Sequence, residues 1–329
     1  MSKVRVAVVG AGHWSTLMHQ PALKRLAAEG ELEVAAVCDL DAEKARAYAD
    51  VLGVEKTFAD LKEMTAAVDP DGLVLLVPTK ISAGLIREAV RLGKPFLVEK
   101  PPAPSSEEHR KLIDEVGDLV HVVAYNRRHS PYITKARELL AGHELQVVAC
   151  HFARSRRRKE DFSTTAVHGI DTVRCLGGDW AGMRLEVAHT GTVLNFFIDG
   201  WTRGGARLDM HITPDTGSGE EHYFVRTEDV NVFVVFPHWS LADKPGFVEA
   251  RRNKIARERF GPDELGLDAG DNSQMAGICS EHLAFARALG GEAPAESTLA
   301  ATLQTQVIRE ELKKVVDSGA LKSVAEVSF

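Results

Sequence analysis

The stretch VRVAVVGAGHWS, residues 4–15, decides the fold of the first half of the chain. Its first six residues are too apolar for a strand with one solvent-exposed face, so they predict a strand buried on both faces. Gly10 and Gly12 then let the chain turn tightly and let a pyrophosphate approach the start of the next helix. Ser15 replaces the third glycine of this motif, and its small side chain still permits close packing. The stretch predicts a nucleotide-binding turn, with an ordinary glycine turn as the alternative.

An acidic residue ends the second predicted strand, LEVAAVCD at residues 32–39. A carboxylate at Asp39 would accept hydrogen bonds from the ribose hydroxyls of a dinucleotide. The same negative charge repels a 2′-phosphate, so NAD is favoured over NADP as the cofactor. The alternative role for Asp39 is the N-cap of the following helix, which Asp41 could provide instead.

Strands and helices alternate through the first half of the chain, and this repeated order predicts a doubly wound parallel sheet of the α/β class. Pro21 predicts a kink or break in the first helix. Further strands are predicted at residues 72–78, 95–100 and 119–126, and helices at residues 14–28, 42–52, 60–68, 82–92 and 105–116.

Residues at the carboxyl ends of these strands are candidates for ligand binding, because ligands of doubly wound sheets bind there. One such end is Pro78-Thr79, and another is Glu99-Lys100, where two prolines stop the strand. Lys100 could hydrogen-bond a substrate hydroxyl and help to move a proton. The alternative is a solvated lysine at a strand end.

The second half is rich in strand patterns separated by turns, which predicts a largely antiparallel sheet. Residues 237–274 are polar, charged and interrupted by glycine and proline, so they are expected to form a long functional loop with one basic helix, or a lid. The predicted strands are residues 145–152, 184–190, 193–198, 206–213, 221–227 and 230–236, and the predicted helices are residues 278–289 and 299–317.

The composition limits the classes of partner. A chain of 329 residues with 44% hydrophobic residues is long enough for two domains. Its formal charge of −7, with both signs mixed, argues against nucleic-acid and membrane binding and favours a small-molecule partner. The four cysteines show no paired spacing, so no metal site and no disulfide framework are predicted, and a reduced compartment is expected. Since no apolar run reaches membrane-spanning length and no cleavage site is evident, a soluble, cytoplasmic protein is expected.

Five segments resemble the Gfo/Idh/MocA family, the group of glucose-fructose oxidoreductase and inositol dehydrogenase. The resemblance implies an N-terminal Rossmann domain over residues 1–125. It also implies a C-terminal α+β domain over residues 126–329, whose open, largely antiparallel sheet carries substrate and oligomer contacts and whose final helices can pack back on the first domain. A homodimer or homotetramer is implied. The five segments are VAVVGAGHW, HQPAL at residues 19–23, VCDLD, LGKPFLVEKPPA, and AYNRRHSP at residues 124–131. The cofactor-binding residues that the resemblance implies are Gly10, Gly12, His13, Trp14, Asp39, Pro78, Thr79, Glu99 and Lys100.

The stretch STTAVHGID, residues 163–171, resembles the family's catalytic helix, in which an aspartate precedes the histidine by four residues. Here Thr164 replaces that aspartate, while His168 and Asp171 match. Ser163 or Thr164 is expected to cap the helix, and Gly177-Gly178 to end it. Helical spacing places an apolar stripe on one side, so His168 is predicted to line a cleft; the alternatives are a core or a merely solvated histidine. The apolar side comprises Ala166, Val167, Ile170, Val173 and Leu176, and the opposite side Thr164, His168, Asp171 and Cys175.

These residues together predict an NAD-dependent enzyme that oxidises a secondary alcohol of a sugar, polyol or sugar acid. Lys100 and His168 would handle the proton, and Asp171 would orient the imidazole. Arginines in RSRRRKE, residues 154–160, favour an anionic carbohydrate-like substrate, with a solvated loop as the alternative. The candidate substrate-binding residues are Asn126, Arg127, Arg156, Thr164 and His168, although Arg127 could equally pair with surface acids.

The missing aspartate at Thr164 keeps a second hypothesis open. On the same scaffold the chain could be non-redox, either a glycosidase-like enzyme that retains NAD or a ligand-sensing regulator.

Overall fold

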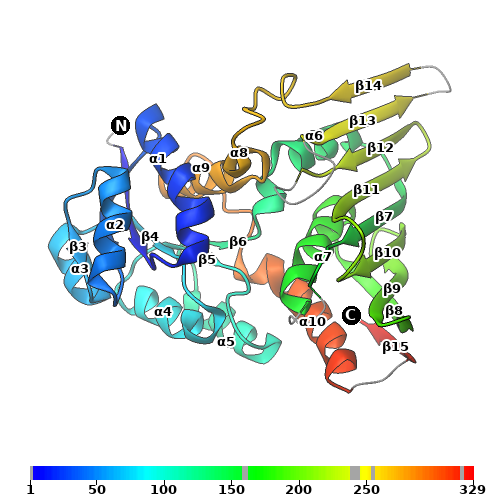
Figure 1. The fold of residues 1–329 in the computed structure, drawn as a ribbon, viewed down its shortest axis with the longest axis horizontal. Helices are drawn as coiled ribbons and strands as arrows, with labels where there is room; N and C mark the ends of the chain where they lie inside the picture. The colour runs from blue at the N-terminus through cyan, green and yellow to red at the C-terminus, as the bar shows by residue number, and fades with distance from the viewer. Residues whose placement is uncertain (1–2, 158–161, 238–244, 253–255, 319–321) are drawn as a thin grey trace. The chain divides into compact units, whose positions relative to one another are not determined.

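A computed structural model describes residues 3–157, 162–237, 245–252, 256–318 and 322–329. The chain forms two compact units (Figure 1). The N-terminal unit combines Met1–His129 with Gly277–Leu303, and the sheet unit combines Ser130–Ala276 with Gln304–Phe329. Within the described residues, no helix has both the length and the apolar character needed to cross a membrane.

The N-terminal unit is built on a six-stranded sheet in the order β3-β2-β1-β4-β5-β6, and within the described residues its strand pairs are all parallel. The strands β1, β4, β5 and β6 are almost completely buried, as their continuous apolar runs predicted. The strand order reverses direction between β1 and β4, and this switch point leaves a crevice at the carboxyl ends of the strands. The strands are β1 (Val4–Val9), β2 (Leu32–Cys38), β3 (Thr57–Phe58), β4 (Gly72–Leu75), β5 (Phe96–Glu99) and β6 (His121–Ala124).

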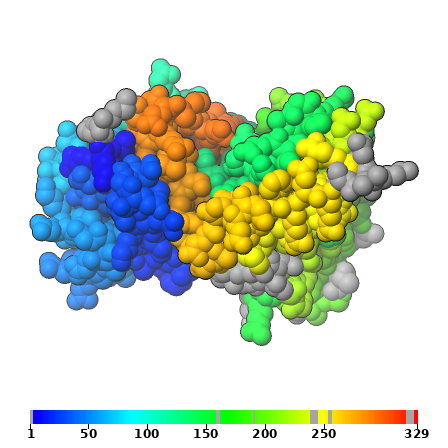
Figure 2. All heavy atoms as spheres, turned by 90° about the horizontal axis from the view of Figure 1, so that it is seen from above, coloured from blue at the N-terminus to red at the C-terminus, as the bar shows by residue number. Residues whose placement is uncertain are grey.

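The first helical segment of this unit is broken where Pro21 predicted a break. A short π-helix, η1 (Ser15–His19), precedes α1 (Gln20–Glu29), and Pro21 lies in the first turn of α1, where its missing N–H costs no hydrogen bond. Late in the chain, α9 (Ile278–Leu289) returns to pack against α1, and Figure 2 shows its orange surface beside the blue N-terminal surface. The other helices are α2 (Ala42–Leu52), α3 (Leu61–Val68), α4 (Thr79–Arg91), α5 (Ser106–Val116) and the 3-10 turn η2 (Asn126–His129).

The sheet unit contains a nine-stranded sheet in the order β14-β13-β12-β11-β7-β10-β9-β8-β15. Only β7 and β10 pair in parallel among the described strand pairs, so the predicted fold class is confirmed for both units. The strands are β7 (Leu145–Ala153), β8 (Trp180–Thr190), β9 (Val193–Thr202), β10 (Arg207–Thr213), β11 (Glu220–Thr227), β12 (Val230–Val235), β13 (Phe247–Arg252), β14 (Ala256–Phe260) and β15 (Lys322–Ser328).

Helices α6 (Pro131–Leu140) and α7 (Ser163–Gly177) lie on one face of this sheet (Figure 1). Side chains from that face and from these helices form one core, which also includes Ile308 and Leu312 of α10 (Leu299–Asp317). The short helix α8 (Asn272–Met275) completes the unit. On the opposite face of the sheet, alternate residues of strands such as β9, β11 and β12 are half-exposed or exposed.

In its described residues, the segment 237–274 forms the strands β13 and β14 where the sequence predicted a basic helix. In its described part, β13 pairs with β12 and β14 pairs with β13, both antiparallel. These residues form a strand rather than a helix because β13 extends the existing sheet and buries Val248 and Ala250 completely. Residues 238–244 and 253–255 of this segment lie outside the described residues.

Candidate functional site

The glycine turn after β1 is shaped by its neighbours. Gly10 has a φ of +102°, and a Cβ atom on it would stand 2.4 Å from the backbone oxygen of Leu76. Only glycine fits at this position. A Cβ on Gly12 would meet nothing within 4 Å, and Gly12 is exposed. The packing therefore requires Gly10, whereas Gly12 keeps open space at the start of the helix, as a cradle for phosphate requires.

The Asp39 carboxylate joins this turn to the end of β2. It accepts hydrogen bonds from the Ala11 amide at 2.7 Å and from the Asp41 amide at 2.9 Å. Asp41 itself caps α2 through the amides of Glu43 and Lys44, so Asp39 does not serve as the helix cap. A carboxylate has about four acceptor positions. Asp39 thus keeps acceptor capacity for the hydroxyls of a ligand.

A cavity of about 570 Å³ opens beside these residues, and four of the predicted cofactor-binding residues line it. Two exposed apolar side chains, Leu40 and Ile81, also line it, and Leu40 is 91% exposed. Cys38 lies at its base, where burial and the charges of Asp60 and Asp39 raise the pKa of the thiol to about 11. A thiol with this pKa stays neutral and is no nucleophile. The four predicted residues are Gly10, Gly12, Asp39 and Pro78.

The other predicted cofactor-binding residues have different surroundings. Thr79 is the half-buried first residue of α4, and His13 is exposed at the start of the first helical segment. Lys100 is half-buried directly after β5. Trp14 and Glu99 contact each other, because the indole Nε1 donates a hydrogen bond to Glu99 Oε1 at 3.0 Å.

Glu99 accepts a second hydrogen bond at the same oxygen, from His19 Nε2 at 2.9 Å. Burial alone would raise the pKa of Glu99, but the hydrogen bond from His19, the charges of His19 and Lys100, and the bond from Trp14 together hold it below its ordinary value. Glu99 is therefore a carboxylate anion at neutral pH. Sequence reasoning listed His19 within a family-like segment and assigned it no role.

Two buried polar residues of α9 extend this arrangement. His282 Nε2 lies 3.0 Å from His19 Nδ1, and burial together with the charge of His19 lowers the pKa of His282 well below its ordinary value. The carboxyl group of Glu281 is fully buried, and burial and the charge of Glu99 raise its pKa well above the ordinary value. Sequence reasoning missed both residues. The available signal was the spacing of Ile278, His282 and Phe285, which places a histidine inside an apolar stripe.

Helix α7 carries the candidate catalytic histidine. Its apolar side is buried as predicted, and Thr164, His168 and Cys175 are half-exposed. The predicted cap is wrong, because the N-cap is Phe162 with helical backbone angles and makes no side-chain bond; side-chain caps require an extended backbone. Gly178, with a φ of +83°, lies directly after the helix, as expected.

Asp171 does not share the half-exposed side of α7. Its side chain is 1% exposed and accepts a hydrogen bond from Thr305 Oγ1 of α10 at 2.8 Å. The Arg174 guanidinium lies 3.9 Å from the same carboxylate. Helical spacing alone placed Asp171 on the same side of the helix as His168, opposite the apolar side, whereas Thr305 of α10 covers it in the structure.

The remaining substrate candidates lie in both units. Asn126 and Arg127 are buried in η2, where Arg127 donates to the Asn126 side-chain oxygen at 3.4 Å. Arg156 is exposed, and its amide donates to Asp215 at 2.7 Å. Arg154 is buried and paired with Glu221, which makes it a structural residue of the sheet unit. Residues 158–160 of the arginine-rich segment lie outside the described residues.

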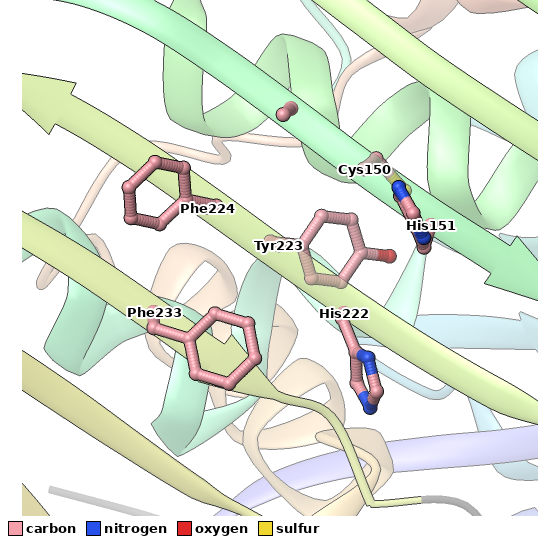
Figure 3. Close-up of a pocket in the computed structure, with 7 residues that line it drawn as sticks. Cys150, His151, His222, Tyr223, Phe224 and Phe233 are labelled. Carbon is pink, nitrogen blue, oxygen red and sulfur yellow. The ribbon is translucent and has the colours of Figure 1, made fainter.

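The outer face of the nine-stranded sheet carries a row of aromatic and imidazole rings. The strand register aligns Phe197, His211, His151 and His222 across four neighbouring strands. A hollow of about 240 Å³ opens beside them, with the rings of Phe224 and Phe233 at one end and the imidazoles of His151 and His222 at the other (Figure 3). Within the described residues, no group of three or more potential ligands has a metal-binding arrangement.

Comparisons with known proteins point in one direction. Residues 4–127 match the GFO_IDH_MocA model, described as an oxidoreductase family with an NAD-binding Rossmann fold. D-glucoside 3-dehydrogenase of Escherichia coli is 31% identical over 128 residues, which are 39% of this chain and 36% of that protein. Inositol 2-dehydrogenase 1 of Saccharopolyspora erythraea is 32% identical over 190 residues, which are 53% of this chain and 54% of that protein. The chain thus matches only 36% to 54% of the length of these relatives.

A solved structure extends the likeness of the fold over nearly the whole chain. An oxidoreductase from Agrobacterium radiobacter, in complex with NAD+, L-tartaric acid and magnesium, matches with a TM-score of 0.78 at 16% identity. The match covers 99% of this chain and 98% of that one.

Proposed function

Because the chain belongs to the Gfo/Idh/MocA family of oxidoreductases, we propose that it is an NAD-dependent dehydrogenase acting on a secondary alcohol of a sugar, polyol or sugar acid. The observation that carries the proposal is the pairing of the Gly10–Gly12 turn with Asp39 at the rim of one cavity. NAD, when bound, would supply the acceptor for the hydride of the alcohol carbon.

The cofactor is held by residues of the N-terminal unit. The open space at Gly12 admits the pyrophosphate at the start of the first helix, and Asp39 accepts the ribose hydroxyls. The exposed apolar side chains of Leu40 and Ile81 offer surface for the adenine ring. NAD is preferred to NADP because the Asp39 carboxylate would repel a 2′-phosphate.

Two side chains handle the hydroxyl proton of the substrate. Lys100 hydrogen-bonds and polarises the substrate oxygen, and His168 takes the proton as general base. Asp171, held by Thr305 at one carboxylate oxygen, orients His168 and favours its protonated form. Thr164, one turn before His168, contributes a hydrogen bond and no charge.

The substrate class includes sugar acids. Asn126, Arg127 and Arg156 are the residues proposed to contact it, and arginine suits a carboxylate through paired hydrogen bonds. The structural neighbour from Agrobacterium radiobacter was solved with L-tartaric acid, a hydroxy acid, which supports this choice.

A substrate panel tests the proposal. Sugars, polyols and sugar acids are offered with NAD, and NADH absorbance is followed for the wild type, His168→Ala and Cys175→Ala. Cys175 lies on the same half-exposed side of α7 and serves as the matched control. His168→Ala is expected to lower kcat by a factor of about 10² to 10⁴. Equal turnover in all three proteins would reject His168 as the base.

The absent aspartate at Thr164 supports one alternative, a non-redox enzyme or sensor that retains NAD. Glycosides added to the same panel, with their hydrolysis followed beside NADH absorbance, separate the two. Cleavage of glycosidic bonds by a chain with bound NAD, without net NADH formation, would replace the dehydrogenase proposal.

We also propose that the chain forms a homodimer or homotetramer through the outer face of its nine-stranded sheet. That face is rich in aromatic side chains and arginines, such as Trp201, Phe197 and Arg207, and these residue types are enriched at protein interfaces. It also carries carboxylates such as Asp199, so a second copy turned by 180° would meet complementary charge.

A further inference from the structure

The hydrogen bonds around Glu99 fix where the protons lie. A carboxylate can only accept, so Trp14 Nε1 and His19 Nε2 must each carry the hydrogen that they direct at Glu99 Oε1. His19 Nδ1 then shares a hydrogen with His282 Nε2, 3.0 Å away. His282, His19 and Glu99 therefore form a continuous hydrogen-bonded chain that runs from α9 through η1 to the end of β5.

These three hydrogen-bonded side chains lie in the protein interior, where an unsupported carboxylate anion would cost free energy. The side chains of His19 and Glu99 are 0% and 12% exposed, and His282 is 1% exposed. A buried carboxylate keeps its charge only where hydrogen-bond donors or cations favour the charged form. The two donors and the neighbouring Lys100 supply that support.

A second carboxyl group limits the charge of this region to one anion. Glu281 is completely buried, and neither of its carboxyl oxygens has a hydrogen-bond partner in the part of the chain that the structure describes. Neighbouring carboxylates do not both ionise in a buried site, so Glu281 stays protonated beside the Glu99 anion. The charged and titratable groups that bear on Glu99 are His19 of η1, Glu281 of α9 and Lys100.

We propose that His19 and His282 are positioning residues that hold Glu99 as a fixed anion directly before Lys100, so that Lys100 keeps its proton and acts as a hydrogen-bond donor to the substrate oxygen. His282 acts through His19, whose ring it orients, much as an acceptor behind a catalytic histidine fixes that ring. Proton removal is then left to His168. The consequence for Lys100 rests on the proposed dehydrogenase function, whereas the consequence for Glu99 does not.

The indole of Trp14 reports the charge of Glu99 without turnover. Its Nε1–H resonance is followed by NMR between pH 5 and pH 9 in the full-length protein and is assigned with Trp14→Phe. In the wild type the resonance is expected to stay constant, because Glu99 remains ionised throughout. In His19→Leu it is expected to titrate within this range, since burial then outweighs the remaining support. His282→Leu is expected to give a smaller change, and His282→Gln, whose side-chain amide can hydrogen-bond His19 Nδ1 in place of Nε2, to restore the wild-type trace.

His109→Gln is the matched control. His109 is equally buried in the same unit, and its Nε2 bonds to the Leu299 carbonyl oxygen at 2.9 Å, apart from the hydrogen-bonded chain of His282, His19 and Glu99. It is expected to lower the melting temperature without moving the Trp14 resonance. A constant resonance in folded His19→Leu, or a moved one in His109→Gln, would overturn the inference.

The pH profile of kcat carries the second half of the test. His19→Leu is expected to shift the acidic and basic limbs of this profile by about one to three pH units. His282→Gln is expected to leave both limbs in place. An unshifted profile in an active His19→Leu enzyme would refute the role of Lys100 as donor. Absence of dehydrogenase activity in the wild type would reject the proposed function instead, while the Trp14 resonance would still decide whether His19 and His282 hold the anion.

Discussion

The amide of Ala11 donates a hydrogen bond to the Asp39 carboxylate over 2.7 Å, so one side chain ties the glycine turn to the end of β2. A residue that was expected to recognise a ligand therefore also shapes the loop that the ligand meets. A substitution can remove the negative charge of Asp39 and still keep an acceptor oxygen for the Ala11 amide.

Asp39→Asn keeps an acceptor oxygen for Ala11 and removes the charge. We expect the preference for NAD over NADP to fall by about tenfold or more, with the fold intact, because the repulsion of a 2′-phosphate is lost. Calorimetric titration with both cofactors measures this. Asp41→Ala, which removes the cap of α2, should cost about 1 kcal/mol of stability and leave the preference unchanged. An unaltered cofactor preference in Asp39→Asn would argue against its role.

The two glycines of the turn should respond differently to alanine. Gly10→Ala must place a Cβ against the Leu76 backbone at a positive φ, so we expect a loss of about 3 kcal/mol in the free energy of unfolding. Gly12→Ala meets no protein atom, so its stability should change by less than about 0.5 kcal/mol, while NAD binding weakens by about tenfold because the methyl group occupies the phosphate path. Urea unfolding and NAD titration separate the two effects. Equal losses of stability would contradict the assignment.

Glu281 should make stability depend on pH in an unusual direction. Its pKa in the folded protein is raised, so above the ordinary value of 4.5 the folded state holds a proton that the unfolded state has released. Stability then falls as pH rises, by about 1.4 kcal/mol per pH unit, until the pKa of the folded state is reached. Glu281→Gln lacks this dependence, so its stability relative to the wild type should increase between pH 5 and pH 7. Urea unfolding at several pH values tests this, with exposed Glu55→Gln as the flat control.

Added negative charge tests whether the outer sheet face forms the contact between copies of the chain. Phe197→Asp and Trp201→Glu place carboxylates on exposed aromatic positions, and we expect either to convert the assembly to a monomer in analytical ultracentrifugation. Val51→Glu alters a comparably exposed apolar residue of α2 in the other unit and should leave the mass unchanged. A wild-type mass equal to one chain would reject self-association outright.

Local patterns predicted the elements whose stability is largely local. The helix at residues 42–52 and the helix at residues 299–317 were predicted with the bounds that α2 and α10 have. Both carry clear helical periodicity, and α2 has an aspartate cap and a terminal glycine. The five strands predicted in the first half followed from their apolar runs, whereas the two-residue strand β3, which has no such run, was not predicted.

The features that sequence reasoning missed depend on contacts between distant residues. Asp171 is buried because Thr305, 134 positions later, packs against it. β13 and β14 form because a sheet edge is available to them, although their composition favours a helix. His282 meets His19 across 263 positions, a pairing that no local pattern in one sequence encodes.

The π-helix η1 has a consequence for insertions and deletions. A π-helical turn accommodates one residue more than an ordinary turn, so η1 amounts to a single inserted residue between the glycine turn and α1. Deleting an exposed residue such as Thr16 would let the segment relax to a regular α-helix and rotate His19 by about 100° relative to the residues before it. His19 would then face away from Glu99. The presence of one residue in this turn thus decides whether His282, His19 and Glu99 form a continuous hydrogen-bonded chain, while the strands of the Rossmann sheet would be kept.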